Sequence, residues 1–382
     1  MKERFYSLDV FRGATVALMI LVNNPGSWAN IYPPLKHAPW HGCTPTDLVF
    51  PFFLFAVGNA MAFVMPGLAN HNVFWKKVTK RSLLIFAIGL FLNWFPFVMY
   101  NADGALVAKQ LANLRIFGVL QRIVVCYFFA AIIVHYLKWW GTVIMATCLL
   151  MGYWLLCLVF GAADPYSLSG WFGTSVDVAL LGAKHMYSGE GVAFDPEGLA
   201  SVLAPIAQVC FGYLVGHYII SRGKTTAMLS RLVSIGVILV LCGIAWSFVF
   251  PLNKKIWTSS YTVYTTGLAI LVLSVLMYAV EFKKWTGAWS RFFDVFGKNA
   301  LFIFSLSGLL PRLLNLIRIP NGAASDGALK FVSPFGWFYQ NVCAKVFPAD
   351  PRFGSLLYAL IFIALMWSIA WYLNKKKIYV KV

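Results

Sequence analysis

Charged residues are scarce in this chain. They make up 12% of its 382 residues, about half the share found in a typical soluble domain. Hydrophobic residues make up 60% and the mean hydropathy is +0.74. This composition excludes an ordinary soluble enzyme and indicates a chain that lies in a bilayer. The 31 Lys and Arg outnumber 13 Asp and Glu, but they stand mostly in short loops between apolar runs, where they set orientation. The net charge of +18 therefore does not predict a nucleic-acid partner.

Motifs of several soluble enzyme classes are also missing from the sequence. It contains neither GxxxxGK[ST] nor GxSxG, which excludes P-loop and α/β-hydrolase chemistry. The seven cysteines show no metal or redox spacing and five lie in apolar runs, which favours small core residues over disulfides. His37 and His41 are four residues apart, but Pro39 lies between them and no third ligand follows at metal spacing. We therefore predict no metal site.

Apolar runs long enough to cross a membrane recur along the whole chain. The predicted spans are 10–24, 48–65, 83–99, 116–135, 139–160, 199–220, 232–250, 261–280, 295–316 and 354–373. Asn23, Asn24 and Pro25 follow the first run in place of a small-residue cleavage site, so we interpret that run as a retained span. The sequence predicts an all-α fold: a polytopic membrane helical bundle of about ten transmembrane helices, forming one domain over residues 1–382.

The distribution of basic residues predicts the orientation of this bundle. Lys and Arg number 17 on the side that holds both termini and 10 on the opposite side, where the loops are longer. Because basic loops stay in the cytoplasm, both termini are predicted to be cytoplasmic and the loop with His37 to face outward. In a bacterium such a chain would belong to the inner membrane. Two long outer loops, 161–198 and 317–353, are predicted to cover an outward-facing site.

The stretch 36–55, KHAPWHGCTPTDLVFPFFLF, begins polar and ends as a span. Its polar residues are more than packing between two spans requires. A histidine side chain is a common general base or nucleophile, so His37 can act in either way, or lie solvated in a loop. Asp47 can orient this imidazole as in a catalytic triad, or only begin the second helix. Asn23 and Asn24 can bind an oxyanion or simply end the first span.

Charged residues predicted inside spans are costly there and often mark functional sites. Arg122 lies within the fourth predicted span and needs a carboxylate or a polar cavity beside it. Other polar candidates lie where spans begin or end: Asp9, Arg12, Asp195, Glu197, Lys298 and Asn299.

Several segments, in order along the chain, resemble one known family. They are SLDVFRG, VNN, KHAPWHGCTPTDLVFPFFLFAVG, GVLQR, FDPEG, PLNKKIWTSSY and KKKIYVKV. They are similar to the catalytic region of heparan-α-glucosaminide N-acetyltransferase and its bacterial relatives. The resemblance implies transmembrane acetylation, in which cytoplasmic acetyl-CoA supplies an acetyl group to the nitrogen of a glucosamine on the far side. It also implies that the protein is in contact with membrane lipid and forms a homodimer.

The resemblance also implies roles for individual residues. His37 matches the catalytic histidine, and Asn23 matches the asparagine after the first span, although a longer following segment leaves Asn24 as the alternative. Since CoA is a polyanion that cannot cross a bilayer unaided, cations near the cytoplasm are expected to hold it. The predicted donor-binding residues are Arg12, Lys76, Lys77, Lys80, Arg81, Arg122, Lys298 and Asn299. The predicted acceptor-binding residues are Trp40, His41, Asp195 and Glu197. Ser307 and Gly308 replace a His-Glu pair of the animal enzyme, so acceptor binding is expected to differ.

Two other functions fit a polytopic chain of this kind. One is a transporter or channel for a sugar or glycan intermediate, and the other is an acyltransferase that modifies a surface glycan on oxygen. A transporter often contains two similar halves, and none is visible in this sequence. Release of the thiol from acetyl-CoA in the presence of different sugars separates the three possibilities.

Overall fold

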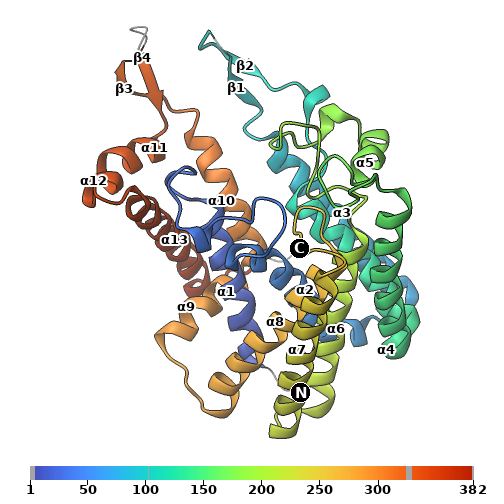
Figure 1. The fold of residues 1–382 in the computed structure, drawn as a ribbon. Helices are drawn as coiled ribbons and strands as arrows, with labels where there is room; N and C mark the ends of the chain where they lie inside the picture. Colours follow the sequence, from blue (N-terminus) through green and yellow to red (C-terminus); the bar gives the residue numbers. More distant parts are fainter. Residues whose placement is uncertain (1–4, 102, 324–328, 381–382) are drawn as a thin grey trace.

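Long helices make up most of the structure, a computed structural model that describes residues 5–101, 103–323 and 329–380. Figure 1 shows the long helices packed side by side, with the short elements β1–β4, α5, α11 and α12 at one end. The longer helices are α1 (Tyr6–Asn23), α2 (Val49–Val64), α3 (His71–Trp94), α4 (Val119–Phe160), α6 (Leu203–Arg222), α7 (Thr226–Ser247), α8 (Ser259–Met277), α9 (Ala288–Lys298), α10 (Ala300–Leu314) and α13 (Pro351–Lys375).

The remaining elements are short. The α-helices among them are α5 (Gly173–Leu181), α11 (Pro334–Phe338) and α12 (Ala344–Val346). The 3₁₀ and π turns are η1 (Pro33–Leu35), η2 (Pro45–Leu48), η3 (Met65–Leu68), η4 (Leu111–Asn113), η5 (Ala183–His185), η6 (Tyr278–Phe282) and η7 (Tyr339–Cys343). Strands β1 (Val98–Tyr100) and β2 (Leu106–Ala108) form one antiparallel pair, and β3 (Ile319–Ala323) and β4 (Leu329–Val332) form another.

The predicted helical membrane architecture is confirmed. In the described residues, seven helices are long and apolar enough to cross a membrane, or eight if α9 and α10 count as one bent span. Helix α3 covers most of the predicted span 83–99, but it begins at His71, ends at Trp94 and is not among the seven, and the last residues of the predicted span reach into β1. Its first half carries four basic residues, which lower its hydropathy. The count of ten crossings stays a prediction.

Helix α4 contains two of the predicted spans. It has 42 residues, about twice the length that a bilayer requires, and it is broken at Lys138, which has φ 55° and ψ −157°. Residues on both sides of the break contact the same loop. The Arg122 guanidinium lies 5.6 Å from the Trp257 ring, and the Tyr153 hydroxyl donates to the carbonyl of Ile256. A straight helix would separate residues 122 and 153 by about 46 Å, so the chain folds back at Lys138.

The predicted span 295–316 is instead a bent pair of helices. Helices α9 and α10 meet at an angle of 81°, and Asn299 between them has φ −125° and ψ 36°. The Asn299 side chain is buried, and its amide forms hydrogen bonds with the backbone of Ile378 and Val380. The polar residue that was predicted to open a straight span therefore marks a break in it.

Glycines allow the central helices to pack closely, as is common in membranes. Helices α2 and α6 cross at Gly58 and Gly212. A β-carbon on Gly58 would lie 2.0 Å from the Val209 carbonyl oxygen, and one on Gly212 would lie 2.2 Å from that of Phe55. A larger residue at either position would push α6 away from α2, which forms most of the span Pro45–Leu68.

The two ends of the bundle differ in what they hold, and we name them the His37 end and the Lys298 end. At the Lys298 end, Arg12 of α1 and Val380, after α13, line the same cavity. Helix α1 and the last described residues therefore meet there. The His37 end holds the loops that enclose the candidate site.

Candidate functional site

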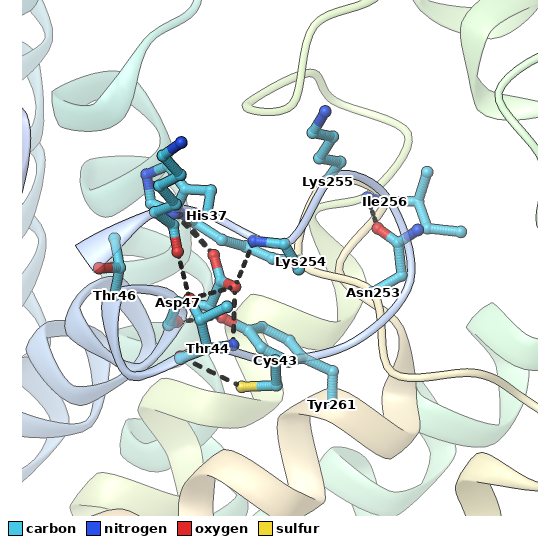
Figure 2. Close-up of polar contacts among 12 residues, drawn as sticks. His37, Cys43, Thr44, Thr46, Asp47, Asn253, Lys254, Lys255, Ile256 and Tyr261 are labelled. Carbon is cyan, nitrogen blue, oxygen red and sulfur yellow. Dashed lines mark hydrogen bonds and ion pairs between the residues drawn. The ribbon is translucent and has the colours of Figure 1, made fainter. Parts of the chain in front are cut away.

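His37 and Asp47 form an ion-pair-like contact at the His37 end. Their Nδ1 and Oδ1 atoms lie 2.7 Å apart, and Figure 2 shows the carboxylate directed at the imidazole. His37 follows the turn η1, and Asp47 lies in η2, which leads directly into α2. The side chain of Asp47 is 1% exposed and that of His37 is 38% exposed. The predicted pairing is thus present, with a buried carboxylate behind an accessible imidazole.

Local hydrogen bonds hold the Asp47 carboxylate in place. Its Oδ2 accepts from the backbone N–H groups of Ala38 and Thr44 and from the Thr44 hydroxyl, each at 3.0 Å. Thr44 and Asp47 thus form a capping box at the start of η2. The alternative role of Asp47, to begin the second helix, is therefore also observed. Because Oδ2 is occupied by three donors, Oδ1 is left to face the imidazole.

Lys254 is a third member of this cluster that was not predicted. Its Nζ lies 3.0 Å from Nδ1 and 3.3 Å from Nε2 of His37, and 3.6 Å from Oδ1 of Asp47. Burial lowers the pKa of Lys254, against the effect of the nearby Asp47 and Glu197 carboxylates. Lys254 belongs to the motif PLNKKIWTSSY, but from the sequence it was interpreted only as one of the basic loop residues that indicate orientation.

The loop that carries Lys254 is rigidly built. The Asn253 side chain accepts from the Ile256 N–H at 3.1 Å, and the Thr258 hydroxyl accepts from the Asn253 N–H at 3.1 Å. The Gly42 N–H donates to the Leu252 carbonyl at 2.7 Å, which ties this loop to the segment with His37. These bonds fix the ammonium relative to the imidazole.

A cavity of about 220 Å³ opens beside His37 and Lys254. Glu190, Glu197, Arg115 and Lys255 contribute charged groups to its wall. Lys255 pairs with Glu190 at 2.8 Å. Loop 161–198, predicted as a cover for the site, supplies both carboxylates, whereas none of the described residues of loop 317–353 lines this cavity.

Arg115 links the two predicted acidic residues of this loop. Its guanidinium contacts both Asp195 oxygens, at 2.9 and 2.6 Å, and Glu197 at 2.6 Å. The two carboxylates raise the pKa of Arg115 above its ordinary value, although burial opposes this. Asp195 is fully buried, so it supports the site from behind, whereas Glu197 lines the cavity.

Trp40 and His41, the other predicted acceptor residues, contact neighbouring loops. Trp40 donates its indole N–H to the Tyr166 carbonyl at 2.8 Å, and the Lys255 ammonium lies 5.7 Å from its ring. His41 Nδ1 lies 3.5 Å from the side-chain nitrogen of Asn253, and burial lowers the pKa of this histidine. Neither residue is among those that line the cavity beside His37.

Asn23 and Asn24 line a different cavity of about 540 Å³, together with Ser307 and Gly308. Arg115 lines both this cavity and the one beside His37. The predicted catalytic pair of Asn23 and His37 therefore lies in two cavities that share one guanidinium. Arg312, which was not predicted, also lines the larger cavity.

A third cavity, of about 400 Å³, lies at the Lys298 end and is lined by three of the predicted donor-binding cations. Arg12 contacts Asp9 at 3.1 Å, Lys298 contacts Asp294 at 2.5 Å, and Arg81 lies 5.0 Å from the Tyr127 ring. Helices α1, α4 and α10 line this cavity and also the one with Asn23. The two cavities thus follow each other along the same three helices.

The other predicted donor-binding residues lie elsewhere. Lys76, Lys77 and Lys80 are exposed on α3 and do not line the third cavity. Arg122 is buried, and its Nη2 donates to the Gly198 carbonyl at 2.6 Å and to the Ser201 hydroxyl. It therefore contacts the end of loop 161–198 and the residues just after it, and it does not line the third cavity with Arg12 and Lys298. Within the described residues, no three His, Cys, Asp or Glu side chains are grouped to hold a metal.

Comparison with known proteins agrees with the motifs. Residues 4–175 match the family model described as heparan-alpha-glucosaminide N-acetyltransferase, catalytic. The chain is also 28% identical to the human heparan-alpha-glucosaminide N-acetyltransferase, in an alignment of 358 residues that covers 79% of this chain. The resemblance to this family is confirmed. The mouse protein of the same name aligns with the whole chain at 26% identity over 439 positions.

The chain matches only part of the length of these N-acetyltransferases. The chain spans 52% of the human protein and 61% of the mouse protein. His37, Asp47, Arg115 and the α1 residue Arg12 all lie in the region matched by the family model. Lys254 lies outside that region, within the alignment that covers the whole chain.

Proposed function

We propose that this protein transfers the acetyl group of acetyl-CoA to the amino group of a glucosamine-type sugar. The observation that carries the proposal is the 2.7 Å contact between His37 and the buried Asp47, beside a cavity with charged walls. An imidazole held by a carboxylate is suited to accept a proton from an attacking nucleophile. The names of the human and mouse relatives support an amino sugar as the acceptor.

The donor is proposed to bind at the Lys298 end. Three cations line a cavity there, and the phosphates of CoA require cationic partners. The basic residues of that side, 17 against 10, support a cytoplasmic location for this end, and in a bacterium the inner membrane. The slim acyl-pantetheine arm would extend along α1, α4 and α10 toward Asn23, where an amide can polarise the thioester carbonyl.

The acceptor is proposed to bind in the cavity beside His37. Glu190 and Glu197 supply carboxylates that can receive the hydroxyl and ammonium donors of an amino sugar. Arg115 and Lys255 neutralise these carboxylates, so the wall carries both signs of charge. Ser307 and Gly308, where the resemblance implies a His-Glu pair in the animal enzyme, line the neighbouring cavity with Asn23 and not the one beside His37. The expected difference in acceptor binding stays a prediction.

The proposed reaction is a direct transfer. The neutral amine attacks the thioester carbonyl, a C–N bond forms, and His37 accepts the proton that the nitrogen loses. The C–S bond then breaks, and the CoA sulfur leaves as a thiolate that takes up the proton. Asp47 stabilises the imidazolium formed during the reaction, as in a triad. Lys254 is positioned to stabilise negative charge that develops beside His37.

Measurement of CoA release from acetyl-CoA by the purified protein tests this function. We expect release with glucosamine and none with glucose or N-acetylglucosamine, because only glucosamine has a free amine. Release with glucose would instead favour transfer to oxygen. The absence of release with every amino sugar, together with sugar uptake into vesicles, would favour the transporter.

A further inference from the structure

The buried amide of Asn299 holds the last described residues of the chain. Helix α13 ends at Lys375, and Lys377, with a left-handed φ of 57°, turns the chain back toward the bundle. Asn299 donates from Nδ2 to the Ile378 carbonyl at 3.1 Å, and the Val380 N–H donates to Oδ1 of Asn299 at 2.8 Å. We call Ile378–Val380 the tail. The two hydrogen bonds bind its backbone, independently of its side chains.

The tail forms part of the wall of the third cavity. Val380 lines this cavity together with Arg12, Arg81 and Lys298. The wall at this position is therefore formed by a segment that follows α13, and Asn299 is the residue outside α13 whose side chain bonds to its backbone. Val380 is 43% exposed and Ile378 is 47% exposed, so the rest of the described chain leaves close to half of each of these apolar residues uncovered.

Asn299 also connects the tail to the break between α9 and α10. Asn299 lies at the 81° bend between α9 and α10. Helix α10 lines the cavity at the Lys298 end through Ala300 and Leu301, and the cavity with Asn23 through Phe304. Asn299 thus holds the tail beside the first residues of α10, which line the third cavity.

The chemistry of this wall fits an organic anion with an apolar arm. Three cations can meet phosphate groups, and the exposed apolar face of the tail can pack against an uncharged chain. We propose that the tail is part of the acetyl-CoA site, and that Asn299 is a positioning residue that acts by holding the tail. This inference rests on the proposed function.

A truncation and a point substitution test this proposal in the otherwise intact protein. One variant ends after Lys377, the second is Asn299→Ala, and the third combines both changes. Each single change should raise the KM for acetyl-CoA roughly tenfold, because two hydrogen bonds to the tail or the tail itself are lost. The double variant should show no further increase, because Asn299 acts through the tail. The kcat and the KM for glucosamine should be unchanged.

Product binding gives a second readout that does not depend on turnover. Free CoA should raise the melting temperature of the wild type more than that of the truncated chain. Asn341→Ala is the matched control, because Asn341 is only half-buried and its side chain bonds only to Trp337 and Lys345 among the described residues. It should leave both KM values unchanged. The truncation leaves the helix break intact, so it tests the proposal even if Asn299→Ala loses stability.

Three results would overturn the proposal. An unchanged KM for acetyl-CoA in the truncated chain would remove the tail from the donor site. A lower KM would show that the tail obstructs the site, and additive effects in the double variant would show that Asn299 acts by itself. Failure of the proposed function is distinguishable, because the wild type would then release no CoA with any amino sugar.

Discussion

The ammonium of Lys254 lies 3.0 Å from Nδ1 of His37, a residue 217 positions earlier in the chain. Lys254 also lies 3.6 Å from the Asp47 oxygen that faces the imidazole. His37 and Lys254 therefore share one carboxylate oxygen, and Asp47 sets the position of both. This arrangement places a base and a cation at the same point of the cavity wall.

We expect Lys254→Met to lower kcat for acetyl transfer by about a hundredfold, because the cation that stabilises developing negative charge is lost. The KM for acetyl-CoA should change little, since Lys254 lies at the opposite end of the bundle from Lys298. Lys184→Met, at an exposed lysine of η5, serves as the control. Equal losses of kcat in the two variants would contradict a specific role for Lys254.

Arg115→Gln should destabilise the protein by about 3 kcal/mol or more, because it leaves the buried Asp195 carboxylate without its cation. The effect should appear as a lower melting temperature in detergent. Arg318→Gln is the control, since Arg318 is exposed and lies 4.2 Å from the Tyr100 ring, with no carboxylate contact in the described residues. A melting temperature for Arg115→Gln equal to that of the control would show that Asp195 finds another partner.

The sequence was informative about the site where chemistry is concentrated in a short segment. His37 and Asp47 are ten positions apart, so the local chain alone could bring them together, and the pairing was predicted. Lys254 and Arg115 could not be assigned in this way. Each reaches the site through long-range packing, and in the sequence each resembles a basic residue that sets orientation.

The helices were predicted more reliably than their breaks. Hydropathy located the apolar runs because every backbone group in a bilayer must bond within its helix. The predicted spans 116–135 and 139–160 separate where α4 folds back at Lys138, but hydropathy does not report where α9 and α10 bend at Asn299. At this bend Asn299 bonds to the tail, a segment that lies 79 positions later in the chain and that hydropathy does not connect with it.

Stability should depend on pH through Asp177 of α5. Burial raises the pKa of this carboxyl to about 6, although the Ala200 N–H donates to it at 2.9 Å. A folded-state pKa above the ordinary 3.8 favours the protonated form. Its contribution to the free energy of unfolding is therefore complete below about pH 4 and is lost as the pH rises through 6.

Asp177→Asn should remove this dependence, because the amide can keep the bond to Ala200 without a charge. Relative to the wild type, the variant should gain stability between pH 4 and pH 7, by up to about 3 kcal/mol. Melting temperatures of both proteins across this range provide the measurement. The difference between the two proteins isolates Asp177 from other titrating groups, and a constant difference would contradict the assignment.

The orientation of the bundle can be tested by cysteine labelling. In a cysteine-free background, single cysteines would replace the exposed residues Ser169 and Lys377. An impermeant reagent applied outside intact cells should label only position 169, because the basic side of the chain faces the cytoplasm. Labelling of position 377 from outside would reverse the proposed orientation.

The role of His37 in the transfer can be decided by mixing the enzyme with labelled acetyl-CoA in the absence of an acceptor. In a direct transfer, the imidazole only accepts a proton, so no stoichiometric release of CoA is expected. In a covalent relay, His37 would attack the thioester, release one CoA per site and retain the label after denaturation. Direct transfer is favoured because a deprotonated amine attacks thioesters readily. The pantetheine arm is also long, about half the 30 Å apolar thickness, so no relay is required for distance.

His37→Ala should keep CoA binding and lose roughly two to four orders of magnitude in kcat. A burst of one CoA per site in the wild type, absent in His37→Ala, would establish the relay instead.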